Sequence, residues 1–167
     1  PRSSSLEISK NDGQDIIKLE SFNDELLVFK SSDLFVIDCS GDIQILTKTF
    51  KGKGIKYITH VVKSHDAVFW MNNSGLFVYK YVPNSGMQVV NILRDKIPSD
   101  QWTKDIYSIG AHLLHDPGRN LLMIVCNYAV GKIKDTVPNN LLIYNLETEA
   151  LFYKSSFSQI PFNYISN

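Results

Sequence analysis

The 167-residue sequence has few of the residues that usually reveal a protein's chemistry. It contains two cysteines, Cys39 and Cys126, too few for the disulfide framework of a small secreted domain. Each lies in an apolar segment, so we expect two buried free thiols. No apolar run approaches the roughly 20 residues of a membrane-spanning helix. We therefore expect no membrane partner.

Excess charge of either sign is also missing. The chain has 17 basic and 17 acidic side chains and a formal net charge of zero. Such a chain has no overall electrostatic field that attracts nucleic acid, so we expect nucleic acid not to be a partner. Residues 1–5 lack the apolar core of a signal peptide, and the first residue is Pro1 rather than Met. This start is typical of a processed or excised segment.

The sequence does contain a series of short apolar runs separated by polar turns, which begins near residue 15. The first group predicts strands at 16–19, 26–29, 34–39 and 43–49. The second predicts strands at 57–62, 67–71, 76–81 and 87–93, and the third at 109–114, 120–127, 141–145 and 150–154. In the first group the runs 26–29, 34–37 and 43–46 are apolar at nearly every position, which predicts that both faces of this sheet are covered. The other two groups are likewise expected to have two apolar faces.

The third strand of each group carries the clearest repeat. Leu34–Asp38 aligns with Leu76–Lys80 at an offset of 42 residues, and Leu141–Asn145 takes the same place in the third group. A period of about 40 to 50 residues with four strands per unit is typical of a β-propeller blade. The predicted fold class is therefore all-β, of propeller type, with three four-stranded antiparallel meanders.

This repeat divides the chain. Three blades are predicted at about 15–50, 57–93 and 109–155, with a short helix inserted at 97–108, a polar tail at 1–14 and a C-terminal extension at 156–167. Closed propellers have about four to eight blades, so we expect these three to belong to a larger ring. Further sequence or another copy of the chain would complete it.

Basic loops are the candidate interaction surface. Lys51, Lys53 and Lys56 lie between the first two units, and Lys132 and Lys134 lie in a polar insertion of the third. Glycines accompany the first cluster, but its spacing differs from that of a nucleotide-binding loop. Two interpretations stay open: a solvated connection between blades, or a contact with an acidic partner.

Neither catalytic nor metal-binding residues are predicted. His65–Asp66 and His115–Asp116 could each pair a base with a carboxylate, but both pairs fall at predicted turns, where Asp favours local backbone hydrogen bonds. His112 and His115 are three residues apart, which places them on opposite faces of a strand. We expect no cofactor and no metal, and we expect Trp70 and Trp102 in the core.

Several segments resemble the propeller blades of structural proteins in tailed-bacteriophage virions. They are Asp15–Lys30 followed by Asp33–Asp38, Ala67–Tyr79, and Asn140–Tyr153. The resemblance implies a non-enzymatic virion protein of a phage tail or connector, whose partners are other virion proteins or further copies of itself.

Two alternatives stay open. A carbohydrate-active propeller enzyme would line its central channel with paired carboxylates, whereas the acids here fall mainly in turns. A cellular scaffold of WD40 or kelch type would carry a Trp-Asp ending or a glycine pair in each unit, and neither occurs here.

Overall fold

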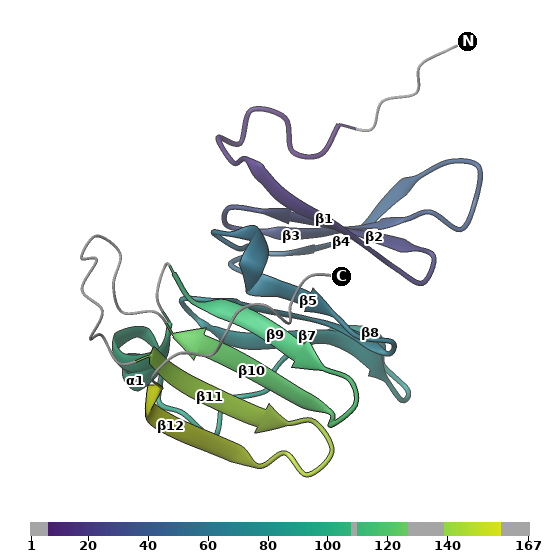
Figure 1. The fold of residues 1–167 in the computed structure, drawn as a ribbon. Helices are drawn as coiled ribbons and strands as arrows, with labels where there is room; N and C mark the ends of the chain where they lie inside the picture. The colour runs from purple at the N-terminus through teal and green to yellow at the C-terminus, as the bar shows by residue number, and fades with distance from the viewer. Residues whose placement is uncertain (1–6, 108–109, 127–138, 158–167) are drawn as a thin grey trace.

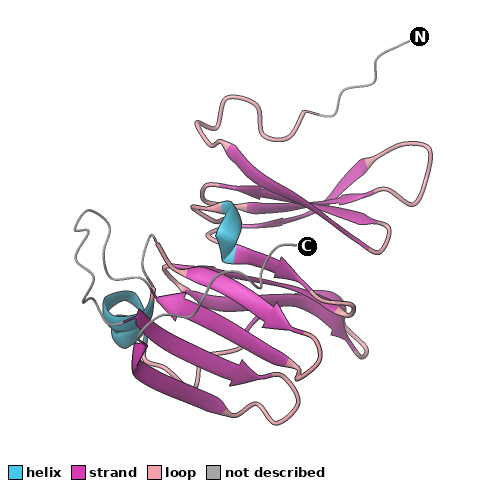
Figure 2. Cartoon of the chain, in the orientation of Figure 1, coloured by secondary structure: helices cyan, strands magenta, loops and turns pink. Residues whose placement is uncertain are grey.

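The computed structural model describes residues 7–107, 110–126 and 139–157 (Figure 1). The protein is all-β, as predicted. Its strands form three four-stranded antiparallel sheets, and in each sheet the strands are hydrogen-bonded in sequence order (Figure 2). Each sheet is therefore a simple meander, which tight turns suffice to connect.

The bounds of the strands follow the predicted repeat closely. Sheet A contains β1 (Ile16–Phe22), β2 (Glu25–Lys30), β3 (Leu34–Asp38) and β4 (Ile45–Phe50). Sheet B contains β5 (Val61–Lys63), β6 (Ala67–Asn72), β7 (Gly75–Val82) and β8 (Gly86–Asn91). Sheet C contains β9 (His112–Asp116), β10 (Leu121–Cys126), β11 (Asn139–Asn145) and β12 (Leu151–Phe157).

The predicted helix is shorter than its 12-residue segment. It consists of one turn of α-helix, α1 (Ser99–Gln101), which continues directly as the π-helical turn η2 (Trp102–Ile106). Trp102 and Ile106 are buried against sheets B and C, and Trp102 Nε1 donates a hydrogen bond of 2.8 Å to the Asn72 carbonyl. The helix thus packs against the ends of the sheets, which the sequence predicted.

Sheet B lies in the middle of the stack (Figure 1). One apolar core joins it to sheet A through residues that include Leu34, Val36, Phe77 and Tyr79. A second core joins its other face to sheet C through Leu76, Val78, Leu142 and Tyr144, among others. Both faces of the middle sheet are therefore buried, as the continuous apolar runs predicted.

The three sheets are stacked in one orientation. We call the face that a sheet turns toward the next sheet along the chain its front, and the other face its back. In the aligned third strands, the first and third residues point to the front of the sheet; they are Leu34 and Val36 in sheet A, and Leu76 and Val78 in sheet B. The second and fourth residues point to the back; they are Phe77 and Tyr79 in sheet B, and Leu142 and Tyr144 in sheet C. Front therefore packs on back at both interfaces.

The first strands of the sheets lie side by side. Lys18 Nζ of β1 donates a hydrogen bond of 3.2 Å to the Val61 carbonyl of β5, and Lys63 Nζ donates one of 2.6 Å to the Ser21 carbonyl of β1. β5 in turn lies beside β9. The innermost strands of propeller blades gather around an axis in the same manner.

The outer strand β4 does not match its prediction. The run 43–46 was expected to be covered on both faces, but Ile43 is 77% exposed and Ile45 58% exposed, because β4 is an edge strand that only β3 pairs with. Its pairing shifts register opposite Val36 and Ile37, and Lys48 points into the stack, where its Nζ lies 3.1 Å from the Met87 carbonyl oxygen of β8.

Two further predictions need correction. The strand expected at 57–62 is instead the 3₁₀ turn η1 (Ile58–His60) followed by the short strand β5. Cys39 was expected to be buried but is exposed, because β3 ends one residue before it. Cys126 is buried as predicted, and burial raises the pKa of its thiol to about 12.

Candidate functional site

The predicted basic loop joins sheet A to sheet B. Lys51 Nζ lies 2.9 Å from Asp33 Oδ2, and Lys53 Nζ lies 4.1 Å from the centre of the Phe77 ring. Lys56 is exposed. Two of these three lysines therefore contact groups of the chain itself, which is the behaviour of a connection between sheets. Lys132 and Lys134 lie outside the described residues.

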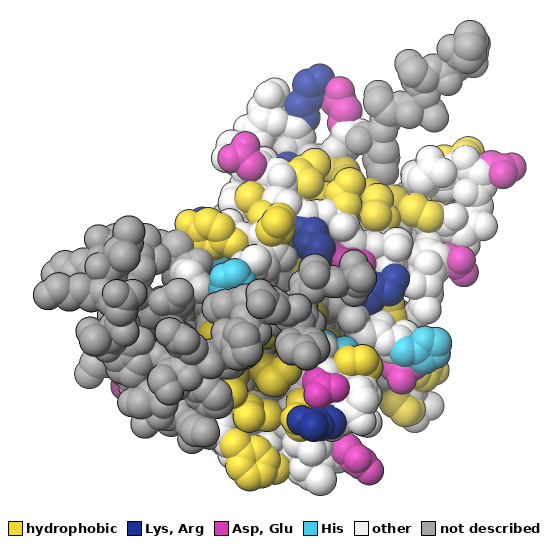
Figure 3. All heavy atoms as spheres, viewed as in Figure 1, with side chains coloured by type: hydrophobic (Ala, Val, Ile, Leu, Met, Phe, Trp, Pro, Cys, Tyr) yellow, Lys and Arg dark blue, Asp and Glu magenta, His cyan; other side chains and the backbone are white. Residues whose placement is uncertain are grey.

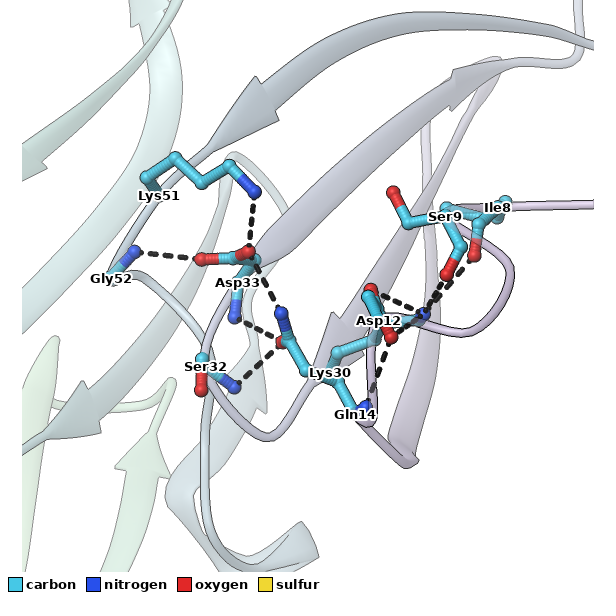
Figure 4. A network of polar contacts seen from close by, with 9 residues as sticks. All are labelled: Ile8, Ser9, Asp12, Gln14, Lys30, Ser32, Asp33, Lys51 and Gly52. Atoms are coloured by element: carbon cyan, nitrogen blue, oxygen red, sulfur yellow. Dashed lines mark hydrogen bonds and ion pairs between the residues drawn. The ribbon is translucent and has the colours of Figure 1, made fainter.

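Asp33 holds the base of this loop (Figure 4). Its buried carboxylate accepts hydrogen bonds from Gln14 Nε2 at 3.0 Å, Lys51 Nζ at 2.9 Å and the Gly52 backbone N–H at 3.0 Å. Burial by itself raises the pKa of Asp33, but these three hydrogen bonds together bring the pKa below its ordinary value. The carboxylate is therefore a charged anchor for the loop at neutral pH.

Lys30 holds residues 7–14 against the back of sheet A (Figure 4). Its side chain is only 5% exposed, and its Nζ donates to the carbonyls of Ile8 and Ser9 and lies 2.9 Å from Asp12 Oδ2. The hydrogen bond from Lys30 lowers the pKa of Asp12. The segment predicted as a polar tail is thus attached to the sheet over its described part, and the buried lysine has its counter-ion.

Gly54 allows the loop to approach sheet A closely. Its N–H donates to the Ser32 carbonyl at 2.8 Å, and the next N–H, of Ile55, donates to the Lys30 carbonyl at 3.0 Å. A Cβ at Gly54 would overlap backbone atoms of Lys30, Ser32 and Asp33. Only glycine fits there, because the neighbouring atoms belong to the backbone and cannot rotate away.

The back of sheet A is one end face of the stack. Its centre consists of Val28, Phe35 and Ile37, which are buried and packed with Ile8 and Leu26. Its rim has exposed apolar side chains: Ile16 is 54%, Leu19 55% and Leu46 40% exposed. A band of hydrophobic side chains is visible over sheet A in Figure 3. This end face is apolar from its centre to its rim.

The front of sheet C is the other end face. A row of paired apolar residues crosses all four strands: Leu114, Met123, Ile143 and Phe152. Phe152, on the outer strand, is 58% exposed. The other three side chains of the row are half-buried. Contiguous apolar residues that remain exposed to this extent mark surfaces that bind other proteins. The two end faces are therefore the candidate interaction surfaces of the molecule.

The two histidine–aspartate pairs occupy different settings. His65 and Asp66 lie in the β5–β6 turn with side chains 99% and 92% exposed, as predicted, whereas His115 and Asp116 end β9 rather than forming a turn. Burial lowers the pKa of His115, and Asp116 partly opposes that shift. Among the described residues, no three His, Cys, Asp or Glu side chains are grouped so that they could bind a metal.

A cavity of about 600 Å³ opens between sheets B and C. Its lining includes the aromatic rings of Phe69 and Tyr144, the imidazole of His115 and the carboxylates of Glu147 and Glu149. The sequence did not predict this cavity, because strands and turns of two sheets that lie far apart in the chain line it together. It is the concave site in which a small ligand would fit.

Comparisons with protein-family models and with curated proteins find no match to this chain. The part of the chain that the structure describes also contains no helix that is long and apolar enough to cross a membrane.

Proposed function

We propose that the chain is a non-enzymatic structural module of a tailed-phage virion, and that it binds neighbouring proteins of a tail or connector through its end faces. One observation carries this proposal: three sheets pack front on back, and the back of sheet A and the front of sheet C remain as apolar faces at the ends of the described stack. A propeller-type ring would cover both of these faces with neighbouring blades.

The virion setting rests on the sequence resemblance. Four segments resemble phage blades: Asp15–Lys30, Asp33–Asp38, Ala67–Tyr79 and Asn140–Tyr153. They coincide with β1 to β3, with β6 and the start of β7, and with most of β11 and the start of β12. Residues of these strands form the apolar cores between the sheets. A role in assembly agrees with their chemistry, since packed β-sheets offer rigid surfaces to partners.

Mass spectrometry of purified particles tests the proposal. Particles from a lysate that contains this protein would be banded on a density gradient, and peptides of residues 15–126 would be quantified against those of the major capsid protein. We expect the peptides to band with intact particles at a fixed ratio. Their presence only in the soluble fraction would contradict a virion role.

The cavity between sheets B and C supports a second candidate function, that of a carbohydrate-active enzyme. Its aromatic rings could stack on a sugar, and Glu147 and Glu149 could supply the two carboxylates of a glycosidase. Reducing-sugar release from a panel of bacterial surface polysaccharides would be measured with the wild type and with the double variant Glu147→Gln/Glu149→Gln. Our proposal expects equal background rates, and a rate that only the wild type shows would favour the enzyme.

A further inference from the structure

We propose that the back of sheet A binds the front of sheet C of a second copy of the chain, so that two copies close a ring of six sheets. The inference rests on the proposed function and deepens it, because it names one partner and the two surfaces that the partner joins. It follows from a comparison of the end faces with the faces of sheet B that are already covered.

The back of sheet A matches the covered back of sheet B row by row. In sheet B the row across the strands is Val61, Trp70, Phe77 and Asn91. The equivalent row in sheet A is Leu19, Val28, Phe35 and Thr49. Each row has three apolar residues followed by a polar residue on the outer strand. The front of sheet A covers the first row. In the second row Val28 and Phe35 are already buried beside Ile8, whereas Leu19 is 55% exposed, so we expect a front face to pack on this exposed end of the row.

The front of sheet C matches the covered front of sheet B in the same manner. The row in sheet B is Val62, Phe69, Val78 and Val90. The equivalent row in sheet C is Leu114, Met123, Ile143 and Phe152. Both rows are apolar on all four strands. The back of sheet C covers the first row, and the second therefore fits a back face.

The electrostatics of the back of sheet A permit this contact. Lys30 is the charged residue that the strands of this sheet direct to the back, and Asp12 neutralises it at 2.9 Å. Burial of an unpaired lysine would oppose association, whereas a lysine that already has its counter-ion adds little cost. Ile8 of the attached segment lies on the same apolar surface and extends it.

A second copy is the partner that supplies both missing faces. In the described part of each chain, the rim of the back of sheet A and the front of sheet C carry exposed apolar residues, including Leu19 and Phe152. These two surfaces would form one more interface of the kind that joins sheets A, B and C. Two copies joined twice in this way make a closed ring with two-fold symmetry. Six sheets lie within the range of about four to eight blades that closed propellers use.

Light scattering coupled to size-exclusion chromatography tests the ring with the full chain. We expect the wild type to have twice the 19.0 kDa chain mass at micromolar concentration. Leu19→Glu places a charge on the back of sheet A and Phe152→Glu places one on the front of sheet C. Both sites are more than half exposed, so each variant should fold and elute at the mass of one chain.

Tyr81→Glu is the matched control, since Tyr81 is 66% exposed on the central sheet B and lies in neither end face. It should keep the mass of two chains. A mixture of Leu19→Glu with Phe152→Glu should form a heterodimer, because one of its two interfaces then joins two unaltered faces. Circular dichroism of each variant confirms that the sheets are intact.

Three results would overturn the proposal. A folded wild type with the mass of one chain would exclude self-association. A Phe152→Glu variant that still dimerises would indicate a back-to-back contact, and a Leu19→Glu variant that still dimerises would indicate a front-to-front contact. The quantification of particle peptides does not depend on these masses, so a failure of the ring and a failure of the virion role can be told apart.

Discussion

Sheets A and B have the same strand order and aligned third strands, but they differ in what covers them. The outer strand β8 of sheet B is mostly half-buried, whereas the equivalent outer strand β4 of sheet A is mostly exposed, including Ile45. The strand pattern encodes two apolar faces in both sheets. Burial of those faces, however, is set by the neighbours of each sheet in the stack. The comparison teaches that this apolar pattern specifies a four-stranded sheet, and that the position of the sheet in the stack decides how much of its surface is buried.

The largest effect should come from removing the centre of sheet B. Trp70 is fully buried and packs against Phe29 of sheet A at a ring-centroid distance of 5.4 Å, so Trp70→Ala should lower the free energy of unfolding by about 3–5 kcal/mol. The control Ile45→Ala in sheet A should change it by less than about 0.5 kcal/mol. Urea denaturation followed by circular dichroism measures both. Similar losses would mean that β4 is covered in solution.

The next effect concerns the loop that joins the two sheets. Gly54→Ala forces a Cβ against the backbone of sheet A, and overpacking of this kind costs about 1–3 kcal/mol of unfolding free energy. Gly41, in the β3–β4 turn, has no atom within 4 Å of an added Cβ, so Gly41→Ala should be close to neutral. Thermal unfolding of both variants would compare their stabilities with that of the wild type. A Gly54→Ala protein as stable as the wild type would contradict the close approach.

A smaller effect should follow from removing a side-chain hydrogen bond that joins sheets A and B. The Tyr79 hydroxyl of sheet B donates a 2.7 Å hydrogen bond to Glu25 Oε2 of sheet A. Burial is the larger cause of the raised pKa of this hydroxyl, and the Glu25 carboxylate is the smaller one. Tyr79→Phe should cost about 1 kcal/mol, because the partly exposed Glu25 can turn to water. A double-mutant cycle with Glu25→Gln isolates the coupling. Additive losses would show that the two groups do not interact.

The smallest effect should be a change of pH dependence at Asp33. Its pKa in the folded chain lies below the ordinary value of 3.8, so the stability that it contributes is complete above that pH and is lost as the pH falls through the folded pKa. Asp33→Asn should therefore flatten the fall in unfolding free energy below about pH 4. Denaturant titrations at several pH values would compare the slopes. Equal slopes would contradict a charged anchor.

The sequence predicted those parts of the fold that are encoded locally. The third strand Leu76–Lys80 is a continuous apolar run beside polar turns, and the structure confirms it within β7. The run at Tyr57–Val62 was also predicted to be a strand, yet half of it forms a 3₁₀ turn, since the chain crosses from one sheet to the next there. Short apolar runs do not distinguish these outcomes.

The polar network and the end faces could not be predicted in the same way. Asp33 meets Gln14 and Lys51 across 19 and 18 positions of the chain, and no motif spacing marks such contacts. The exposure of Leu46, which pairs with Ile37 on the back of sheet A, depends on what lies against that face, and the pattern of one sheet does not contain that information. Cys39 was misplaced because β3 ends one residue earlier than expected, and strand ends are weakly encoded.

Lys48 has a consequence for the behaviour of the protein at high concentration. The outer strand β4 presents unpaired backbone groups to solvent, and such edges can recruit strands from other molecules into aggregates. Lys48 directs its charge inward toward β8, and the register shift opposite Val36 and Ile37 distorts the edge. A foreign strand would have to bury that charge and follow the distortion. β4 can therefore stay apolar and exposed without acting as a template for amyloid-like growth.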